Sequence, residues 1–165
     1  MSKADAARND RVLAGLRIAV GALFLIFGEY KLAGSQFVHG GFAGWIGRFL
    51  EGGTYPFMEP VLRGLVLPHA LLLAWLVALG ETAIGLALVL GLLVRTASAF
   101  GLIYMLALLF SSNYPGAGRP LWQYFGASLD HSVLALCFAA FALGEADRVL
   151  AMRSLFERPV GRVRR

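Results

Sequence analysis

Glu81 is the residue of this sequence whose position most clearly indicates a chemical role. It lies at the midpoint of an apolar run, 68–94, where a charged side chain costs on the order of 3 kcal/mol on membrane-insertion scales. A carboxyl group in such surroundings binds its proton more tightly than in water, which suits proton transfer. The alternative is a protonated or hydrogen-bonded glutamate that serves helix packing alone. We take Glu81 as the candidate catalytic residue.

Six further charged or titratable residues are candidates for a polar pocket around Glu81. They are Arg17, Glu29, Lys31, Arg95, Asp130 and His131. At about 1.5 Å of rise per helical residue, most of them reach the outer half of their apolar runs, as Glu81 does, whereas Arg17 lies only about 8 Å from its cytoplasmic end. Lys31, His131 or a chain of waters is therefore the expected partner of Glu81. The alternative is that they are ordinary boundary residues whose side chains extend to water.

Other catalytic and metal-binding patterns find little support. His39, His69 and His131 all fall on the predicted outer side, but their spacing matches neither a metal site nor a bis-histidine haem site, so no metal is predicted. Cys137 is the single cysteine, which excludes an internal disulfide and favours a packing role. No Ser-His-Asp order, phosphate loop or dinucleotide fingerprint occurs. The chemistry of soluble enzymes is therefore not indicated.

The elements that must position these residues are apolar helices. Of the 165 residues, 58% are hydrophobic and 15% are charged, and the mean hydropathy is +0.69, which favours a lipid bilayer as the surroundings. Four apolar runs, 12–33, 68–94, 97–112 and 129–146, approach the roughly 20 residues that a helix needs to cross the hydrocarbon core. Only helices satisfy their own backbone there, and no alternation typical of barrel strands is present. We predict an all-α membrane protein with a bundle of four transmembrane helices.

The distribution of charge predicts the orientation. The first run is longer than the apolar core of a signal peptide, so an uncleaved anchor is expected. Basic residues concentrate in the N-terminal arm and the C-terminal tail, whereas the opposite loops hold only Arg48, Arg63 and Arg119. The positive-inside bias therefore places both termini in the cytoplasm. The same end-loaded charge, a formal +5, suits anionic lipid better than nucleic acid, so no nucleic-acid partner is predicted.

Two segments outside the apolar runs carry patterns of their own. In the first outer loop, 34–67, Phe42, Trp45, Ile46 and Phe49 have the spacing of one side of a short helix, although six glycines weaken that prediction. This aromatic side suits either an interfacial anchor or an apolar cap over the bundle. The tail, 148–165, alternates basic and apolar residues like an amphipathic surface helix that ends near Pro159. The predicted organisation is an arm (1–11), a membrane domain (12–147) and a tail (148–165).

Small residues recur at every fourth position in three of the runs. Ala83, Ala87 and Gly91 form such a strip in the second run, Gly15 and Ala19 in the first, and Ala97 and Gly101 in the third. Strips of this kind let neighbouring helices approach closely. They predict a compact bundle and carry no functional signal.

Three stretches resemble the DoxX family of small bacterial membrane proteins, which includes the DoxD-like small subunit of thiosulfate:quinone oxidoreductase. The first run reads LRIAVGALFLIFGEYKLAG, the second LGETAIGLALVLGLLVRTASAF, and the fourth, a looser match, LDHSVLALCFAAFALGEADR. The residues that carry the resemblance are Arg17, Gly21, Phe24, Gly28 and Lys31, followed by Glu81, Gly85, Gly91 and Arg95. The first outer loop, rich in glycine and aromatic residues, is less typical of the family.

The resemblance implies a multi-pass protein of the bacterial cytoplasmic (inner) membrane that serves as a membrane subunit of a quinone-linked oxidoreductase complex. Glu81 and its neighbours would then handle a quinone head group or its protons. Because the sequence contains no electron carrier, a redox-enzyme partner subunit is expected. A non-catalytic scaffold or accessory protein ranks nearly equal, and a small-solute permease is less supported. The sequence does not specify an oligomeric state.

Overall fold

The computed structural model describes residues 3–152, and within them every regular element is a helix. The long helices are α1 (Lys3–Ala33), α4 (Ala70–Leu90), α5 (Val94–Ser111) and α7 (Leu129–Leu143). The shorter elements are η1 (Phe37–Gly41), α2 (Phe42–Gly52), α3 (Glu59–Val61), η2 (Leu62–Val66) and α6 (Leu121–Gly126). The predicted all-α class is therefore confirmed.

Three of the described helices are long and apolar enough to cross a membrane. They are α1, α4 and α5, which correspond to the first three predicted runs. Helix α7 is apolar but has only 15 residues, and it ends at Leu143 because Gly144 adopts an extended backbone conformation. It is thus three residues shorter than the predicted run. A fourth crossing by α7 stays a prediction.

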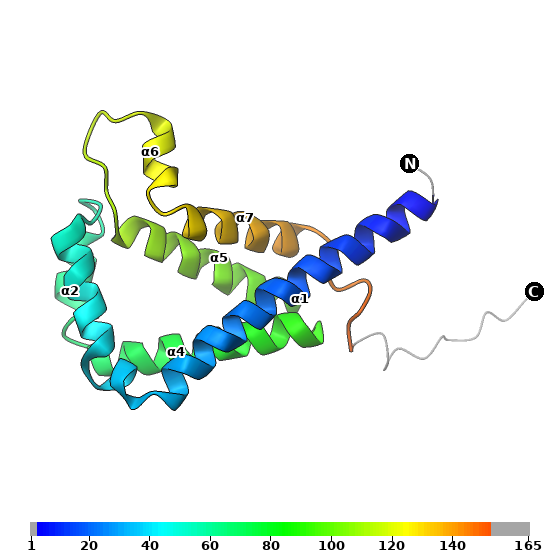
Figure 1. The fold of residues 1–165 in the computed structure, drawn as a ribbon, viewed down its shortest axis with the longest axis horizontal. Helices are drawn as coiled ribbons and strands as arrows, with labels where there is room; N and C mark the ends of the chain where they lie inside the picture. The colour runs from blue at the N-terminus through cyan, green and yellow to red at the C-terminus, as the bar shows by residue number, and fades with distance from the viewer. Residues whose placement is uncertain (1–2, 153–165) are drawn as a thin grey trace, which may run out of the picture.

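The long helices pack as two pairs, α1 against α4 and α5 against α7 (Figure 1). The pairs meet where α4 turns into α5 and diverge toward the other end, where α2 lies across the open side (Figure 1). The turn between α4 and α5 uses left-handed backbone at Gly91 (φ 70°) and Leu93 (φ 50°). The start of α1 and the end of α7 lie at the same end of the bundle, opposite α2 and α6 (Figure 1).

Glycines set the contact between α1 and α4, chiefly Gly21, Gly28 and Gly85, which lie outside the predicted strips. A Cβ at Gly85 would lie 2.8 Å from the backbone nitrogen of Leu25 and 2.9 Å from the carbonyl oxygen of Gly21. The expectation that Ala83 and Gly15 serve this packing is wrong: Ala83 is exposed, and nothing lies within 4 Å of a Cβ at Gly15. The reason is that α4 turns the face bearing Gly85 toward α1. In α5, Gly101 does serve packing, against the ring of Phe138.

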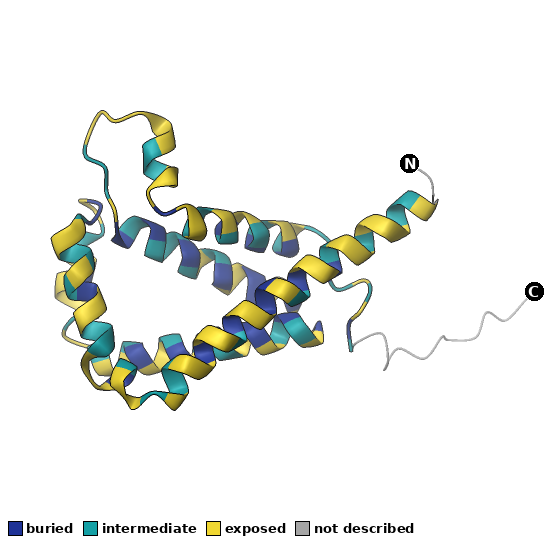
Figure 2. Ribbon diagram, in the orientation of Figure 1, coloured by how far each residue is buried: buried dark blue, intermediate teal, exposed yellow. Residues whose placement is uncertain are grey.

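Apolar side chains cover the outside of the bundle as well as its core. The core includes Phe24, Leu88 and Phe138, from three different helices. The outward faces of the same helices carry exposed leucine, isoleucine and phenylalanine side chains. Figure 2 shows exposed residues, in yellow, along the outside of the long helices. A helix that is apolar on all sides is expected in lipid. The structure therefore supports the bilayer as the environment of the long helices.

The chain after α7 folds back onto α1 and α4, at the end of the bundle that is predicted to face the cytoplasm. Arg17, which is fully buried, donates from Nη2 to the carbonyl oxygen of Leu150 at 2.6 Å, and the backbone of Met152 donates to Leu90 at 2.8 Å. The predicted tail helix is thus absent over residues 148–152, where the backbone groups of Leu150 and Met152 bond to α1 and α4 instead. The rest of that prediction, with Pro159, lies outside the described residues.

Candidate functional site

A cavity of about 630 Å³ lies beneath α2, between the two helix pairs. Its polar lining consists of Lys31, Glu81, Tyr104, Asp130 and His131. Its aromatic lining consists of Phe24, Phe27, Tyr30, Phe37, Phe42, Trp45 and Phe49. The cavity therefore combines a few convergent polar groups with apolar and aromatic walls, as small-molecule sites commonly do.

The carboxylate of Glu81 is the centre of the polar lining. Lys31 Nζ donates to Glu81 Oε1, and the hydroxyl of Tyr104 donates to the same oxygen at 2.6 Å. The side chains of Lys31 and Glu81 are 16% and 7% exposed, so the ion pair is largely shielded from solvent. The other carboxylate oxygen, Oε2, is buried without a hydrogen-bond partner among the described residues. Glu81 therefore keeps acceptor capacity for a ligand.

Close packing of α1 on α4 brings Lys31 to Glu81. At Gly28, one turn before Lys31, the backbone of α1 approaches so closely that a Cβ would clash with Thr82. Lys31 itself lies in the last turn of α1, where the helix dipole favours a positive charge. Its ammonium group also lies 5.2 Å from the ring centroid of Phe37. Lys31 was one of the partners predicted from depth, and the structure confirms that pairing.

Tyr104 is the site residue that sequence reasoning missed. It is one of four hydroxyl side chains in an otherwise mostly apolar helix, and tyrosine is ordinary at such positions. A signal was nevertheless present: Glu81 precedes Gly91 by about as many residues as Tyr104 follows Val94, roughly ten in each case. Two helices joined by a tight turn bring such positions to the same depth.

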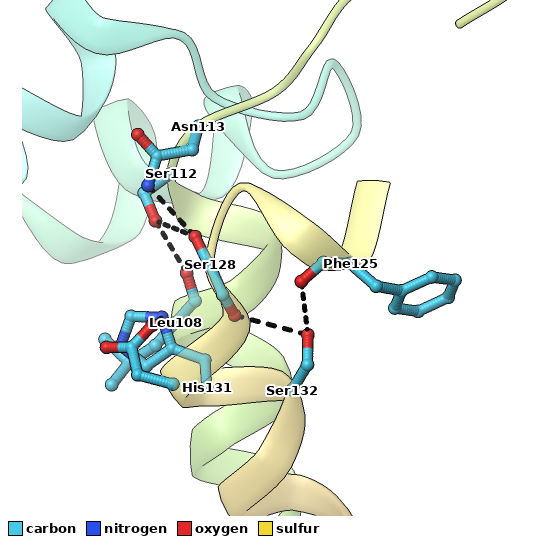
Figure 3. A network of polar contacts seen from close by, with 8 residues as sticks. Leu108, Ser112, Asn113, Phe125, Ser128, His131 and Ser132 are labelled. Atoms are coloured by element: carbon cyan, nitrogen blue, oxygen red, sulfur yellow. Dashed lines mark hydrogen bonds and ion pairs between the residues drawn. The ribbon is translucent and has the colours of Figure 1, made fainter. Parts of the chain in front are cut away.

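His131 and Asp130 reach the cavity from the first turn of α7. His131 Nδ1 lies 3.6 Å from Asp130 Oδ1. Figure 3 shows the network that fixes this turn: Asn113 Nδ2 donates to the Ser128 hydroxyl at 2.9 Å, and the Ser112 hydroxyl lies 3.5 Å from the same oxygen. Ser128 immediately precedes α7. The end of α5 therefore sets where His131 enters the cavity.

Helix α2 forms the roof of the cavity. Phe42, Trp45, Ile46 and Phe49 all line it, which confirms the short helix predicted from their spacing and favours the cap over the interfacial anchor. After the turn at Gly53 (φ 98°), the chain is tied to the end of α5, because the Thr54 hydroxyl lies 2.9 Å from the carbonyl oxygen of Ser111.

Tyr55 connects the segment after α2 to helix α6. Its hydroxyl donates to the carbonyl oxygen of Tyr124 at 3.0 Å. Burial, and then the neighbouring phenols of Tyr124 and Tyr114, raise the pKa of Tyr55 above its ordinary value. The phenol therefore stays protonated and able to donate well above neutral pH.

Three predicted pocket residues lie elsewhere. Glu29 is exposed and points away from Lys31, since two residues along a helix correspond to a rotation of about 200°. Arg95 is exposed near the turn between α4 and α5, and Arg17 binds Leu150. None of the three lines the cavity.

The remaining histidines do not converge on the site. His39 and His69 each place Nδ1 within 2.9 Å of a carbonyl oxygen of their own segment, from Ser35 and Leu65 respectively. Within residues 3–152, no three histidine, cysteine, aspartate or glutamate side chains come together as a metal site would require. His39 and His69 therefore lie outside the cavity, whose polar lining is formed by Lys31, Glu81, Tyr104, Asp130 and His131.

Comparison with known proteins identifies the family. No curated protein and no solved structure matches the chain. The family model described as DoxX matches residues 12–113, which include Lys31, Glu81 and Tyr104 but end before α7. The match covers more than half of the chain, with most of α1 and all of α4 and α5, the helices among residues 3–152 that are long and apolar enough to span a bilayer. The chain is a multi-pass membrane protein that belongs to the DoxX family.

Proposed function

We propose that this protein binds the ring of a membrane quinone in the cavity beneath α2 and serves as the membrane subunit of a quinone-linked oxidoreductase complex, in the manner of a DoxD-like subunit. The observation that carries the proposal is the buried cluster of Lys31, Glu81 and Tyr104 in the wall of an aromatic cavity. A cluster of this kind offers both donors and an acceptor at a depth that soluble substrates rarely reach.

The lining residues fit a quinone ring. Aromatic side chains from α1 and α2 provide flat apolar surfaces for a planar ring. The Lys31 ammonium group has N–H donors beyond the one it gives to Glu81, and a quinone carbonyl oxygen can accept from them. The oxygen of the Tyr104 hydroxyl, whose one hydrogen goes to Glu81, and Glu81 Oε2 can each accept from a quinol hydroxyl. The volume of about 630 Å³ lies in the range of small-molecule sites.

Each residue then has a definable task. A bound quinone supplies two-electron, two-proton redox chemistry. Lys31 and Tyr104 orient the ring through its oxygen atoms, and Glu81 holds or releases a proton in a site of low dielectric. His131 and Asp130, on the opposite wall, offer a route for protons toward the outer surface. The electrons come from a partner subunit, because the sequence contains no carrier motif.

The proposed setting is the cytoplasmic membrane of a bacterium, with both termini inside the cell. The excess of lysine and arginine in the terminal segments supports this orientation. The cavity beneath α2 then opens toward the outer side.

A scaffold role is the second candidate, and one observation favours it. The pair of Lys31 and Glu81 joins α1 to α4, so the same charges can specify helix pairing without touching a ligand. Buried polar pairs fix register in some helical assemblies. The experiment below separates the two functions.

The test is retention of quinone by the purified protein. Wild-type protein, purified in mild detergent, is extracted with organic solvent and its quinone is quantified per polypeptide. We expect quinone in the wild type and a loss of at least about tenfold in affinity with Glu81→Gln, because the variant removes the charge that holds Lys31 and Tyr104 in place. Tyr104→Phe removes one donor and keeps the ion pair, and it should weaken binding in the same direction.

Glu51→Gln is the matched control. Glu51 is an exposed glutamate at the end of α2 that does not line the cavity, so its variant should bind as the wild type does. Circular dichroism verifies that each variant is folded. A folded wild type that retains no quinone and shows no affinity for added quinone would refute the proposal and leave the scaffold role.

A further inference from the structure

A second cavity, of about 430 Å³, lies between α4 and α5 and meets the first at Val77, Glu81 and Tyr104. Apart from Glu81, Tyr104 and Thr96, the residues that line it have no polar side chain. Helices α4 and α5 enclose this space without filling it, because α4 packs mainly on α1 and α5 mainly on α7 (Figure 1). We call this second cavity the lateral groove.

The lateral groove opens toward lipid. At its rim Leu76, Leu93 and Phe100 are 56%, 79% and 64% exposed, as expected of side chains that face hydrocarbon. Its floor is made of small residues, and nothing lies within 4 Å of where a Cβ at Gly80 would be. The strip of Ala83 and Ala87, which the sequence assigned to helix packing, lines this groove instead.

We propose that the lateral groove binds the polyprenyl chain of a quinone whose ring occupies the cavity beneath α2. This inference rests on the proposed function and extends it from a ring to a lipid with a long apolar chain. The groove runs along α4 from Leu73 to Ala87, which is about 20 Å at 1.5 Å per residue. The cavity beneath α2 holds the charged side chains, and the lateral groove is almost entirely apolar. A ligand that fills both therefore needs a polar part in the cavity and an apolar part in the groove.

The depth of Glu81 favours this ligand over a phospholipid. Glu81 lies near the middle of α4, so the polar end of the ligand must lie deep in the bilayer. A phospholipid would have to bring a charged head group to that depth, which is expensive in hydrocarbon. An uncharged ring on an apolar chain reaches it without that penalty. Linking chain to ring also makes the second contact intramolecular, which raises affinity.

The test compares two quinones that share one ring, one bearing a polyprenyl chain and one without it. In a Trp75→Phe, Trp122→Phe background, Trp45 is the only tryptophan and lines the cavity beneath α2, so quenching of its fluorescence reports occupation by the ring. Gly80→Leu fills the groove with a side chain. We expect it to weaken binding of the chain-bearing quinone by about tenfold and to leave the ring-only quinone unchanged.

Gly15→Leu is the matched control, because Gly15 is a helical glycine with open space around it that lines neither cavity. It should bind both quinones as the wild type does. Equal effects of Gly80→Leu on both quinones, or no effect on either, would overturn the groove assignment while leaving the ring site intact. Failure of the wild type to bind either quinone would instead refute the proposed function. Conversion of an oligomer to a monomer by Gly80→Leu, seen by light scattering, would assign the groove to a second copy of the chain and overturn the inference.

Discussion

Glu81 accepts hydrogen bonds from two helices other than its own, so its partners can be removed one at a time. Lys31 carries the opposite charge and Tyr104 carries none. Removing one member of a shielded ion pair leaves an uncompensated charge, whereas replacing both members by apolar groups is often neutral. The two kinds of variant therefore separate structural from functional roles.

We predict that Lys31→Met destabilises the protein by about 2–3 kcal/mol, at the lower end for a shielded pair because Lys31 keeps 16% exposure. The double variant Lys31→Met, Glu81→Met should regain most of that loss. Unfolding in a graded series of denaturing detergent measures both. A double variant that is as unstable as the single one would show that the pair itself holds α1 on α4.

The sequence predicted how deep in the membrane the site residues lie, but not which side of its helix each residue occupies. Lys31 was expected at the depth of Glu81, and it is there. Glu29 was expected at a similar depth and points elsewhere, because depth does not determine the side of the helix on which a residue lies, and a helix that is apolar on all sides has no pattern that shows which side faces the site. Tyr104 has no charge, so the cost that singles out Glu81 in a membrane does not single out its partner.

At the scale of elements, the contact between α1 and α4 depends on glycines, and Gly85 is the clearest case. A Cβ at Gly85 would meet backbone atoms of Leu25 and Gly21 at 2.8 and 2.9 Å, and backbone cannot yield as a side chain can. We predict that Gly85→Ala destabilises the protein by about 1–3 kcal/mol through overpacking. Gly15→Ala is the control: with no neighbour within 4 Å, it should be neutral or stabilising by up to about 1 kcal/mol through helix propensity. Thermal unfolding of both variants in detergent is the measurement, and equal midpoints would contradict the assignment.

The sequence predicted which segments are helices, but not which faces of those helices contact one another. Length and hydropathy predicted the four apolar runs, and the spacing of Phe42, Trp45, Ile46 and Phe49 predicted α2 despite its glycines. The strip of Ala83 and Ala87 was expected to pack closely against a neighbouring helix and does not, because small residues permit a close approach without requiring one. Only the three-dimensional arrangement shows that this strip lines a groove.

At the scale of the whole molecule, the two ends of the described chain meet. Arg148, just after α7, lies 3.8 Å from Asp10 in the first turns of α1, and Leu150 is bound by Arg17. An even number of crossings is required if these contacts form in the membrane, because an odd number would leave the ends on opposite sides. The contacts therefore support a full crossing by α7, although its 15 residues span only about 22 Å at 1.5 Å per residue.

This geometry predicts which positions a membrane-impermeant thiol reagent can reach. In a Cys137→Ala background, single substitutions Ala7→Cys in α1, Ala117→Cys between α5 and α6, and Leu150→Cys after α7 place one thiol at each exposed position. In sealed spheroplasts we expect labelling of Ala117→Cys alone, and labelling of all three after the membrane is opened, because the positive-inside bias keeps both ends in the cytoplasm. Labelling of Leu150→Cys in sealed cells, with Ala7→Cys still protected, would mean that α7 does not cross. The ion pair between Asp10 and Arg148 could not then form in the bilayer.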